Sequence, residues 1–127
     1  MHFAREDCDS ELMVRACDGE QIIVGQHSYR GSLILTPQQV IPDWRPTRRD
    51  ELSEQDFELA LSLQPEILLL GTGSRLRFPA PRLTASILAS GTGFEVMDTA
   101  AACRTFNILL SEKRQVIAAL LLDPAPV

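Results

Sequence analysis

The tripeptide Gly71-Thr72-Gly73 is the local sequence whose residue types could most directly do chemistry. It follows the apolar run 67–70 and precedes a helical pattern, which is the context of a dinucleotide-binding loop. Glu95 lies about 20 residues further on, where a ribose-binding acid would stand. However, Leu76 occupies the position of the third glycine, and Phe78-Pro79 delays the helix. A tight turn with close backbone packing is therefore favoured over nucleotide binding.

The same tripeptide could instead hold a small anion. Glycine has no Cβ, so the backbone N–H groups of such a turn can face outward as a concave group of donors. Arg75 and Arg77 follow within four residues, and an arginine fork strengthens anion binding. Asn107 stands between apolar neighbours of a predicted helix, where it either bonds backbone groups or forms a wall of the site. The candidate ligand-binding residues are therefore Gly71, Thr72, Gly73, Arg75, Arg77 and Asn107, with plain packing of the turn as the favoured alternative.

Residues for nucleophilic, metal or cofactor chemistry form no recognisable pattern. The chain has neither G-x-S-x-G nor G-x-x-x-x-G-K-[ST], the signatures of a serine nucleophile and a phosphate-binding loop. His27 stands between predicted strands without an acid or cysteine nearby, and a general base needs such a partner. Cys8, Cys17 and Cys103 lack paired spacing, which argues against a disulfide framework or a metal site. We therefore expect no catalytic residue, no metal, no cofactor and a reducing compartment.

The charge balance narrows the possible partners. The 127 residues carry a formal net charge of −5, which argues against nucleic acid because that binding depends on neutralised phosphates. No stretch approaches the ~20 apolar residues of a membrane span, and residues 5–11 are acidic, unlike a targeting signal. We expect no membrane span and a cytoplasmic location. Arg45, Arg48 and Arg49 are followed at once by two acids, so this group is interpreted as solvated loop charge.

The elements that must position these residues fall into two halves. In the first half, short apolar runs at 12–17, 22–24, 32–36 and 40–41 are separated by Gly and Pro, which favours a meander of antiparallel strands. Asp18-Gly19 is a hairpin signal in which the glycine would supply a positive φ.

The second half alternates strands and helices. Helices are predicted over 54–63, about 80–90 and about 99–110, and strands over 67–70, 94–97 and 115–122. The unbroken apolar run at 67–70 indicates a strand buried on both faces. This order predicts an α/β fold with an N-terminal antiparallel meander, about three helices and right-handed crossovers. We expect one domain over residues 12–122, with flexible tails at 1–11 and 123–127.

Several motifs together resemble a known family. They are Ile22-x-Val24-Gly25, Tyr29-x-Gly31-Ser32-Leu33, Pro42-Asp43-Trp44, Pro65-Glu66-Ile67-Leu68-Leu69-Leu70-Gly71-Thr72-Gly73, Met97-Asp98-Thr99-x-Ala101-x-Cys103-x-Thr105-Phe106-Asn107 and Arg114-x-Val116-x-Ala118-Ala119-Leu120. Over residues 12–122 the chain is similar to a small archaeal, bacterial and mitochondrial family of unknown molecular function. Its mitochondrial branch includes an assembly factor of respiratory complex I, the NADH dehydrogenase. The resemblance implies a three-layer β/α fold with a central mixed sheet, and no established catalytic residues or cofactor. Lys113 departs from it, because a glycine is expected in the turn before the last strand.

Two hypotheses of function follow. The first is a non-enzymatic interaction or assembly protein with a protein partner, based on the missing catalytic constellation and on the resemblance. The second is a small-anion or small-metabolite binding protein, or an enzyme, that uses a pocket at Gly71-Thr72-Gly73.

Overall fold

A five-stranded mixed sheet forms the centre of the computed structural model, which describes residues 12–123. Its strand order is β5-β4-β8-β6-β7. The strands are β4 (Leu33–Leu35), β5 (Val40–Pro42), β6 (Ile67–Gly71), β7 (Gly93–Met97) and β8 (Val116–Leu120). β6 pairs in parallel with both β7 and β8, whereas β4 is antiparallel to β8 and to β5. The predicted α/β fold with a central mixed sheet is confirmed.

The predicted N-terminal meander is divided between two sheets. β1 (Val14–Cys17), β2 (Ile22–Val24) and β3 (His27–Tyr29) form a separate antiparallel sheet. β4 and β5 continue the meander in sequence, but they join the central sheet through β8. His27, expected between strands, begins β3 and is exposed.

The turn between β1 and β2 also differs from the prediction. Gly19 has no positive φ. A positive φ of 59° occurs instead at Gly25, in the next turn, between β2 and β3. The side chain of Asp18 shapes the first turn instead, because its carboxylate accepts hydrogen bonds from the N–H groups of Glu20 and Gln21 at 2.8 and 3.0 Å. An aspartate that bonds the backbone two residues further on is a turn former in its own right.

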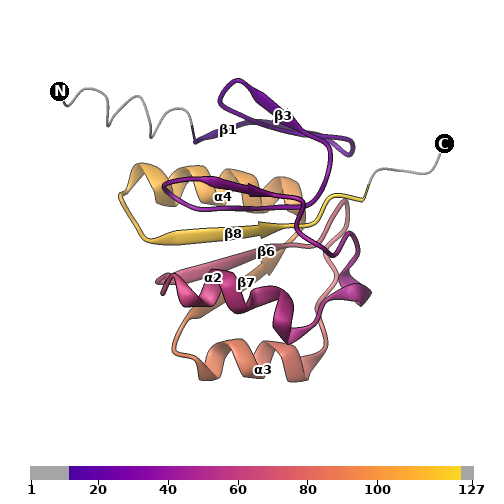
Figure 1. The fold of residues 1–127 in the computed structure, drawn as a ribbon, viewed down its shortest axis with the longest axis vertical. Helices are drawn as coiled ribbons and strands as arrows, with labels where there is room; N and C mark the ends of the chain where they lie inside the picture. The colour runs from indigo at the N-terminus through magenta and orange to yellow at the C-terminus, as the bar shows by residue number, and fades with distance from the viewer. Residues whose placement is uncertain (1–11, 124–127) are drawn as a thin grey trace.

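Three α-helices cover the two faces of the central sheet within residues 12–123. They are α2 (Glu58–Ser62), α3 (Pro81–Ala89) and α4 (Thr99–Ser111), and two short 3₁₀ helices, η1 (Arg49–Glu51) and η2 (Glu54–Phe57), precede α2. In Figure 1, α4 lies between the central sheet and the β1–β3 sheet, while α2 and α3 lie on the opposite side. The helix predicted over 54–63 is thus η2 followed by α2. The carbonyl of Asp56 accepts the indole N–H of Trp44 at 3.0 Å, which gives this carbonyl a partner outside the helix.

The core has two parts, one on each face of the central sheet. Leu69 faces α4 and the β1–β3 sheet, in a cluster that includes Phe106. Leu68 and Leu70 point to the other face, where Phe57 joins them. This alternation follows from the two-residue period of a strand. The strand predicted at 67–70 to be buried on both faces is confirmed, since Leu68, Leu69 and Leu70 are fully buried.

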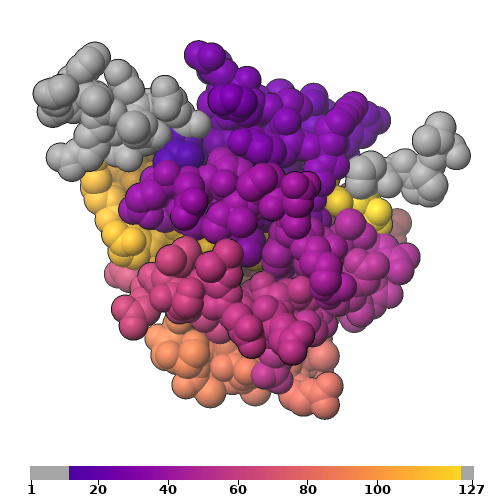
Figure 2. All heavy atoms as spheres, viewed as in Figure 1, coloured from indigo at the N-terminus to yellow at the C-terminus, as the bar shows by residue number. Residues whose placement is uncertain are grey.

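The turn that leads into β8 has the backbone conformation for which a glycine was expected. Lys113 has a φ of 63°, in the left-handed region that glycine adopts most readily after a helix. Tails were predicted at 1–11 and 123–127. Residues 1–11 and 124–127 lie outside the described residues, and the domain boundaries stay a prediction. In the space-filling view, atoms of the first half of the chain cover most of the visible face (Figure 2).

Candidate functional site

The loops at the carboxyl ends of β6 and β7 leave the sheet in opposite directions. β6 leads to α3 on one face, and β7 leads to α4 on the other (Figure 1). Such a divergence opens a crevice at the edge of the sheet, where ligands bind in many open α/β sheets. Gly71-Thr72-Gly73 lies at this edge, in the turn that ends β6.

The start of α4 packs directly on the glycine loop. A Cβ at Gly71 would stand 2.8 Å from the Cα of Thr99 and 2.9 Å from its Oγ1, so only glycine fits. Gly73 has a φ of 99°, a conformation open to glycine but strained for other residues. Its N–H donates to Thr99 Oγ1 at 2.8 Å, and its carbonyl accepts from the Thr99 N–H at 2.9 Å. Gly71 is therefore required by the packing of α4 against the loop, and Gly73 by its own backbone conformation.

The side chain of Thr72 forms hydrogen bonds with the backbone of the segment that follows it. Its hydroxyl donates to the carbonyl of Arg75 at 2.6 Å and accepts from the N–H of Arg77 at 3.1 Å. Its own N–H donates to the carbonyl of Met97 at 2.9 Å. The side chain is 7% exposed, so these bonds are sheltered from water and fix the course of residues 72–77.

These contacts differ from the predicted anion site in which groups are available to a ligand. The N–H groups of Thr72 and Gly73, expected to face outward, donate within the fold. Asn107 lies away from the loop: its side-chain oxygen accepts the N–H of Val14 and its amide donates to the Val14 carbonyl, both at 2.8 Å. Of the predicted residues, Thr72, Gly73, Arg75 and Arg77 share one cleft, and Asn107 does not reach it.

The cleft beside the loop also contains the other arginine group. It has a volume of about 350 Å³ and is called the arginine cleft below; it is lined by Thr47, Arg48, Arg49, Asp50, Thr72, Gly73, Ser74, Arg75, Arg77 and Asp123. Arg48 and Arg49, interpreted from the sequence as solvated loop charge, thus line the same cleft as Arg75 and Arg77. In the sequence, two short segments each carry two closely spaced arginines. Only the fold shows that the two segments line one cleft.

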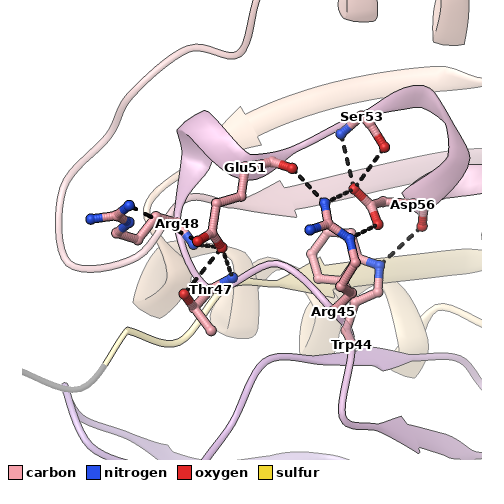
Figure 3. Close-up of polar contacts among 7 residues, drawn as sticks. All are labelled: Trp44, Arg45, Thr47, Arg48, Glu51, Ser53 and Asp56. Atoms are coloured by element: carbon pink, nitrogen blue, oxygen red, sulfur yellow. Dashed lines mark hydrogen bonds and ion pairs between the residues drawn. The ribbon is translucent and has the colours of Figure 1, made fainter.

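The loop that carries Arg48 and Arg49 is held by two carboxylates (Figure 3). Glu51 Oε1 accepts the Thr47 N–H at 2.8 Å, and this bond holds the pKa of Glu51 below its ordinary value. Asp56 accepts a two-pronged contact from Arg45, at 2.9 Å from Nε and 2.7 Å from Nη2. This contact lowers the pKa of Asp56 and raises that of Arg45.

A second cleft adjoins the first at Gly73, Ser74 and Asp123. It measures about 300 Å³, and Cys17 and Asp98 contribute to its lining. Asp98 caps α4 by accepting the N–H of Ala101 at 2.8 Å. The neighbouring thiol of Cys17, followed by burial, raises the pKa of the Cys103 thiol. Cys103 therefore stays in its protonated, unreactive form.

The described residues offer neither a cluster of metal ligands nor a membrane-spanning helix. Among residues 12–123, no three His, Cys, Asp or Glu side chains gather as metal ligands would. In the same range, no helix has the length and apolar character that crossing a membrane requires.

Similarity to other proteins places the chain among known relatives. It is 35% identical over 96 residues to a mouse protein named NADH dehydrogenase [ubiquinone] 1 alpha subcomplex assembly factor 3, which covers 74% of this chain and 51% of that protein. The chain therefore spans about half the length of this curated relative. An uncharacterised protein of Rhodobacter capsulatus is 37% identical over 99 residues, covering 78% of this chain and 75% of that protein.

Solved structures include the same fold. The NMR structure of a Xanthomonas campestris protein superposes with a TM-score of 0.81 at 35% identity, over 90% of this chain and 86% of the other. Residues 14–121 match the family described as "Protein of unknown function (DUF498/DUF598)". The resemblance seen in the sequence motifs is confirmed, and it is to this family of unknown function that the chain belongs.

Proposed function

We propose that the chain is a non-enzymatic protein that binds a protein partner and assists the assembly of a respiratory NADH dehydrogenase. The observation that carries the proposal is its similarity, over about three quarters of its length, to curated proteins named as assembly factors of that enzyme. The shared region includes only about half of those relatives, so the role assigned to this chain is the part that its own domain can perform.

The hydrogen bonds at the carboxyl ends of the strands support a non-enzymatic role. The hydroxyl of Thr99 bonds both the glycine loop and the carbonyl of Leu121. The hydroxyl of Thr72 bonds its own loop, and the Asp98 carboxylate caps α4. These polar groups hold the fold together, whereas catalysis needs such groups directed at a substrate.

The loop between β6 and α3 supports a protein partner. Leu76 is 50% exposed and Phe78 is 68% exposed, and they alternate with Arg75 and Arg77. Aromatic and arginine side chains are enriched among the residues that carry the binding energy of protein interfaces. We place the partner contact on this loop, and we retain the cytoplasm as the predicted compartment.

The test is complementation of a gene deletion in the organism that encodes the chain. We expect the deletion to deplete the fully assembled NADH dehydrogenase on native gels, and the intact gene to restore it. Phe78→Ser should fail to restore assembly. Ile108→Ser, which changes a similarly exposed apolar residue on α4, should restore it and serves as the matched control. A normal amount of assembled enzyme in the deletion strain would refute the proposal.

A further inference from the structure

Four arginines from two separate loops line the arginine cleft. Arg48 and Arg49 come from the segment after β5, and Arg75 and Arg77 from the segment after β6. We propose that this cleft binds the phosphoryl group of a small molecule. Arg75 and Arg77 belong to the loop on which the partner contact was placed, whereas Phe78, the residue that the assembly test changes, is outside the lining of the cleft.

The charge in the cleft runs against that of the chain. Asp50 and Asp123 are the acids in its lining, so the four guanidinium groups leave two positive charges in excess. The whole chain has a net charge of −5. A phosphate monoester carries a charge of about −1.5 to −2 at neutral pH, which the excess in the cleft would neutralise. A long polyanion such as nucleic acid would meet the acidic surface elsewhere.

Three of the four arginines have unused donors. Within residues 12–123, the side chains of Arg49, Arg75 and Arg77 take part in no hydrogen bond or ion pair. Arg75 and Arg77 are exposed and line the cleft. An oxyanion in the cleft would therefore accept hydrogen bonds from guanidinium groups that have no acceptor within the fold.

Both walls of the cleft are held in place without the ligand. Arg45 and Asp56 brace the 45–51 loop, and Glu51 binds the N–H groups of Thr47 and Arg48 (Figure 3). On the other wall, the Thr72 hydroxyl fixes the backbone of Arg75 and Arg77. Two preformed walls reduce the loss of entropy that accompanies binding. The planar arginine forks also match the tetrahedral oxygens of a phosphoryl group in pairs.

The experiment is a titration of the ¹⁵N-labelled protein with inorganic phosphate and pyrophosphate, followed by NMR at constant ionic strength. We expect saturable shifts centred on residues 47–50 and 72–77. Arg75→Gln combined with Arg77→Gln should weaken binding at least tenfold. The control combines Arg30→Gln with Arg82→Gln, which removes two exposed charges outside the cleft and should change affinity less than twofold.

Further arms decide the ligand class. Succinate, at the same concentration, should produce weaker shifts, since it presents single carboxylates instead of a phosphoryl dianion. Equal or tighter binding of succinate would overturn the phosphoryl assignment. Shifts that grow linearly without saturation, or that fall equally in both double variants, would refute the site. Circular dichroism of each variant establishes that it is folded. The assembly test uses the gene deletion and Phe78→Ser, so failure of the phosphoryl site and failure of the assembly role are read from separate experiments.

Discussion

Thr99 holds three segments together through one backbone N–H group and one hydroxyl. Its Oγ1 donates to the carbonyl of Leu121 at 2.7 Å and accepts the N–H of Gly73 at 2.8 Å. The residue is 3% exposed, so each bond replaces a lost contact with water. The close fit of Thr99 against Gly71 is the structural reason for a glycine at the end of β6.

Gly71→Ala tests this fit. The new Cβ would lie within 3 Å of two Thr99 atoms, so α4 has to shift, and we expect a loss of about 1–3 kcal/mol in the free energy of unfolding. Urea denaturation measures the change. Gly31→Ala is the control, because a Cβ there meets nothing within 4 Å. Equal losses in the two variants would show that the contact with Thr99 is not the cause.

Asp56 makes a second prediction at the scale of the residue. The hydrogen bonds from Arg45, followed by those from Ser53, hold the pKa of Asp56 below its ordinary value of 3.8. A lowered pKa in the folded state stabilises the protein above the pKa of the unfolded chain, and this stability is lost as pH falls through the folded value. We therefore expect unfolding by urea to become easier below about pH 4.

Asp56→Asn isolates this contribution. The variant should lose about 1.5–3 kcal/mol at pH 7, the range for hydrogen bonds to charged groups, and its stability should fall less steeply than the wild type between pH 5 and pH 2.5. Asp50→Asn, at an exposed residue, is the control. An unchanged pH profile in Asp56→Asn would assign the acid sensitivity to other carboxylates.

At the scale of the element, a side chain of α4 acts as a partner for the backbone of a strand. Asn107 accepts from the N–H of Val14 and donates to its carbonyl, in the pattern by which neighbouring strands pair. β1 thus has β2 on one side and an amide from α4 as an additional partner. This contact fastens the small sheet to the rest of the molecule across 93 positions of sequence.

Asn107→Ala should release β1 locally. The loss of both hydrogen bonds leaves the Val14 groups without partners, and we expect destabilisation of about 1–3 kcal/mol. Hydrogen exchange should accelerate in β1 and β2 before it changes in β6 or β8, because local openings need less free energy than global unfolding. Equal acceleration in β1 and β8 would show instead that the two sheets open as one unit.

At the scale of the whole molecule, β6 connects the two parts of the core. Leu69 contributes to the cluster under α4, while Leu68 and Leu70 contribute to the cluster over α2 and α3. Because adjacent residues of one strand belong to both clusters, a substitution that loosens the packing on one face of the sheet also destabilises the other face. The protein should therefore unfold as a single cooperative unit, as most small domains do.

Leu69→Ala tests this coupling. Leu69 is fully buried, so the substitution should lower the free energy of unfolding by about 2–5 kcal/mol through lost burial and a residual cavity. Trp44 lies in the other cluster, and its fluorescence should show the same lowered unfolding transition as circular dichroism. Two separate transitions would show that the faces unfold independently.

Local patterns were sufficient to predict the elements of the second half. The apolar run before Gly71, the cap at Asp98 and the position of Pro81 gave β6, α4 and α3 within a few residues. Side-chain period and capping are local properties, so they are legible in the sequence. The same is true of the glycine preference at Lys113, which the φ of this residue explains.

The partition of the strands and the arginine cleft could not be predicted in this way. β4 belongs to the central sheet because it pairs with β8, some 85 residues later, and no local pattern records such a pairing. Arg49 and Arg75 likewise meet only after η1 and the glycine loop are placed at the same edge. From the sequence, Asn107 could either bond backbone groups or form a wall of the anion site. Its hydrogen bond to Val14 favours the first, and that bond depends on the packing of α4 against β1, which no local pattern predicts.

The central position of β8 has a consequence for synthesis of the protein on the ribosome. β8 lies between β4 and β6, yet it emerges after every other described strand. Until then, the nascent chain presents β4 and β6 with open edges, and such edges recruit strands of other molecules. Conditions that shield these edges, such as more chaperone, should raise the yield of folded protein without changing the stability of the finished fold.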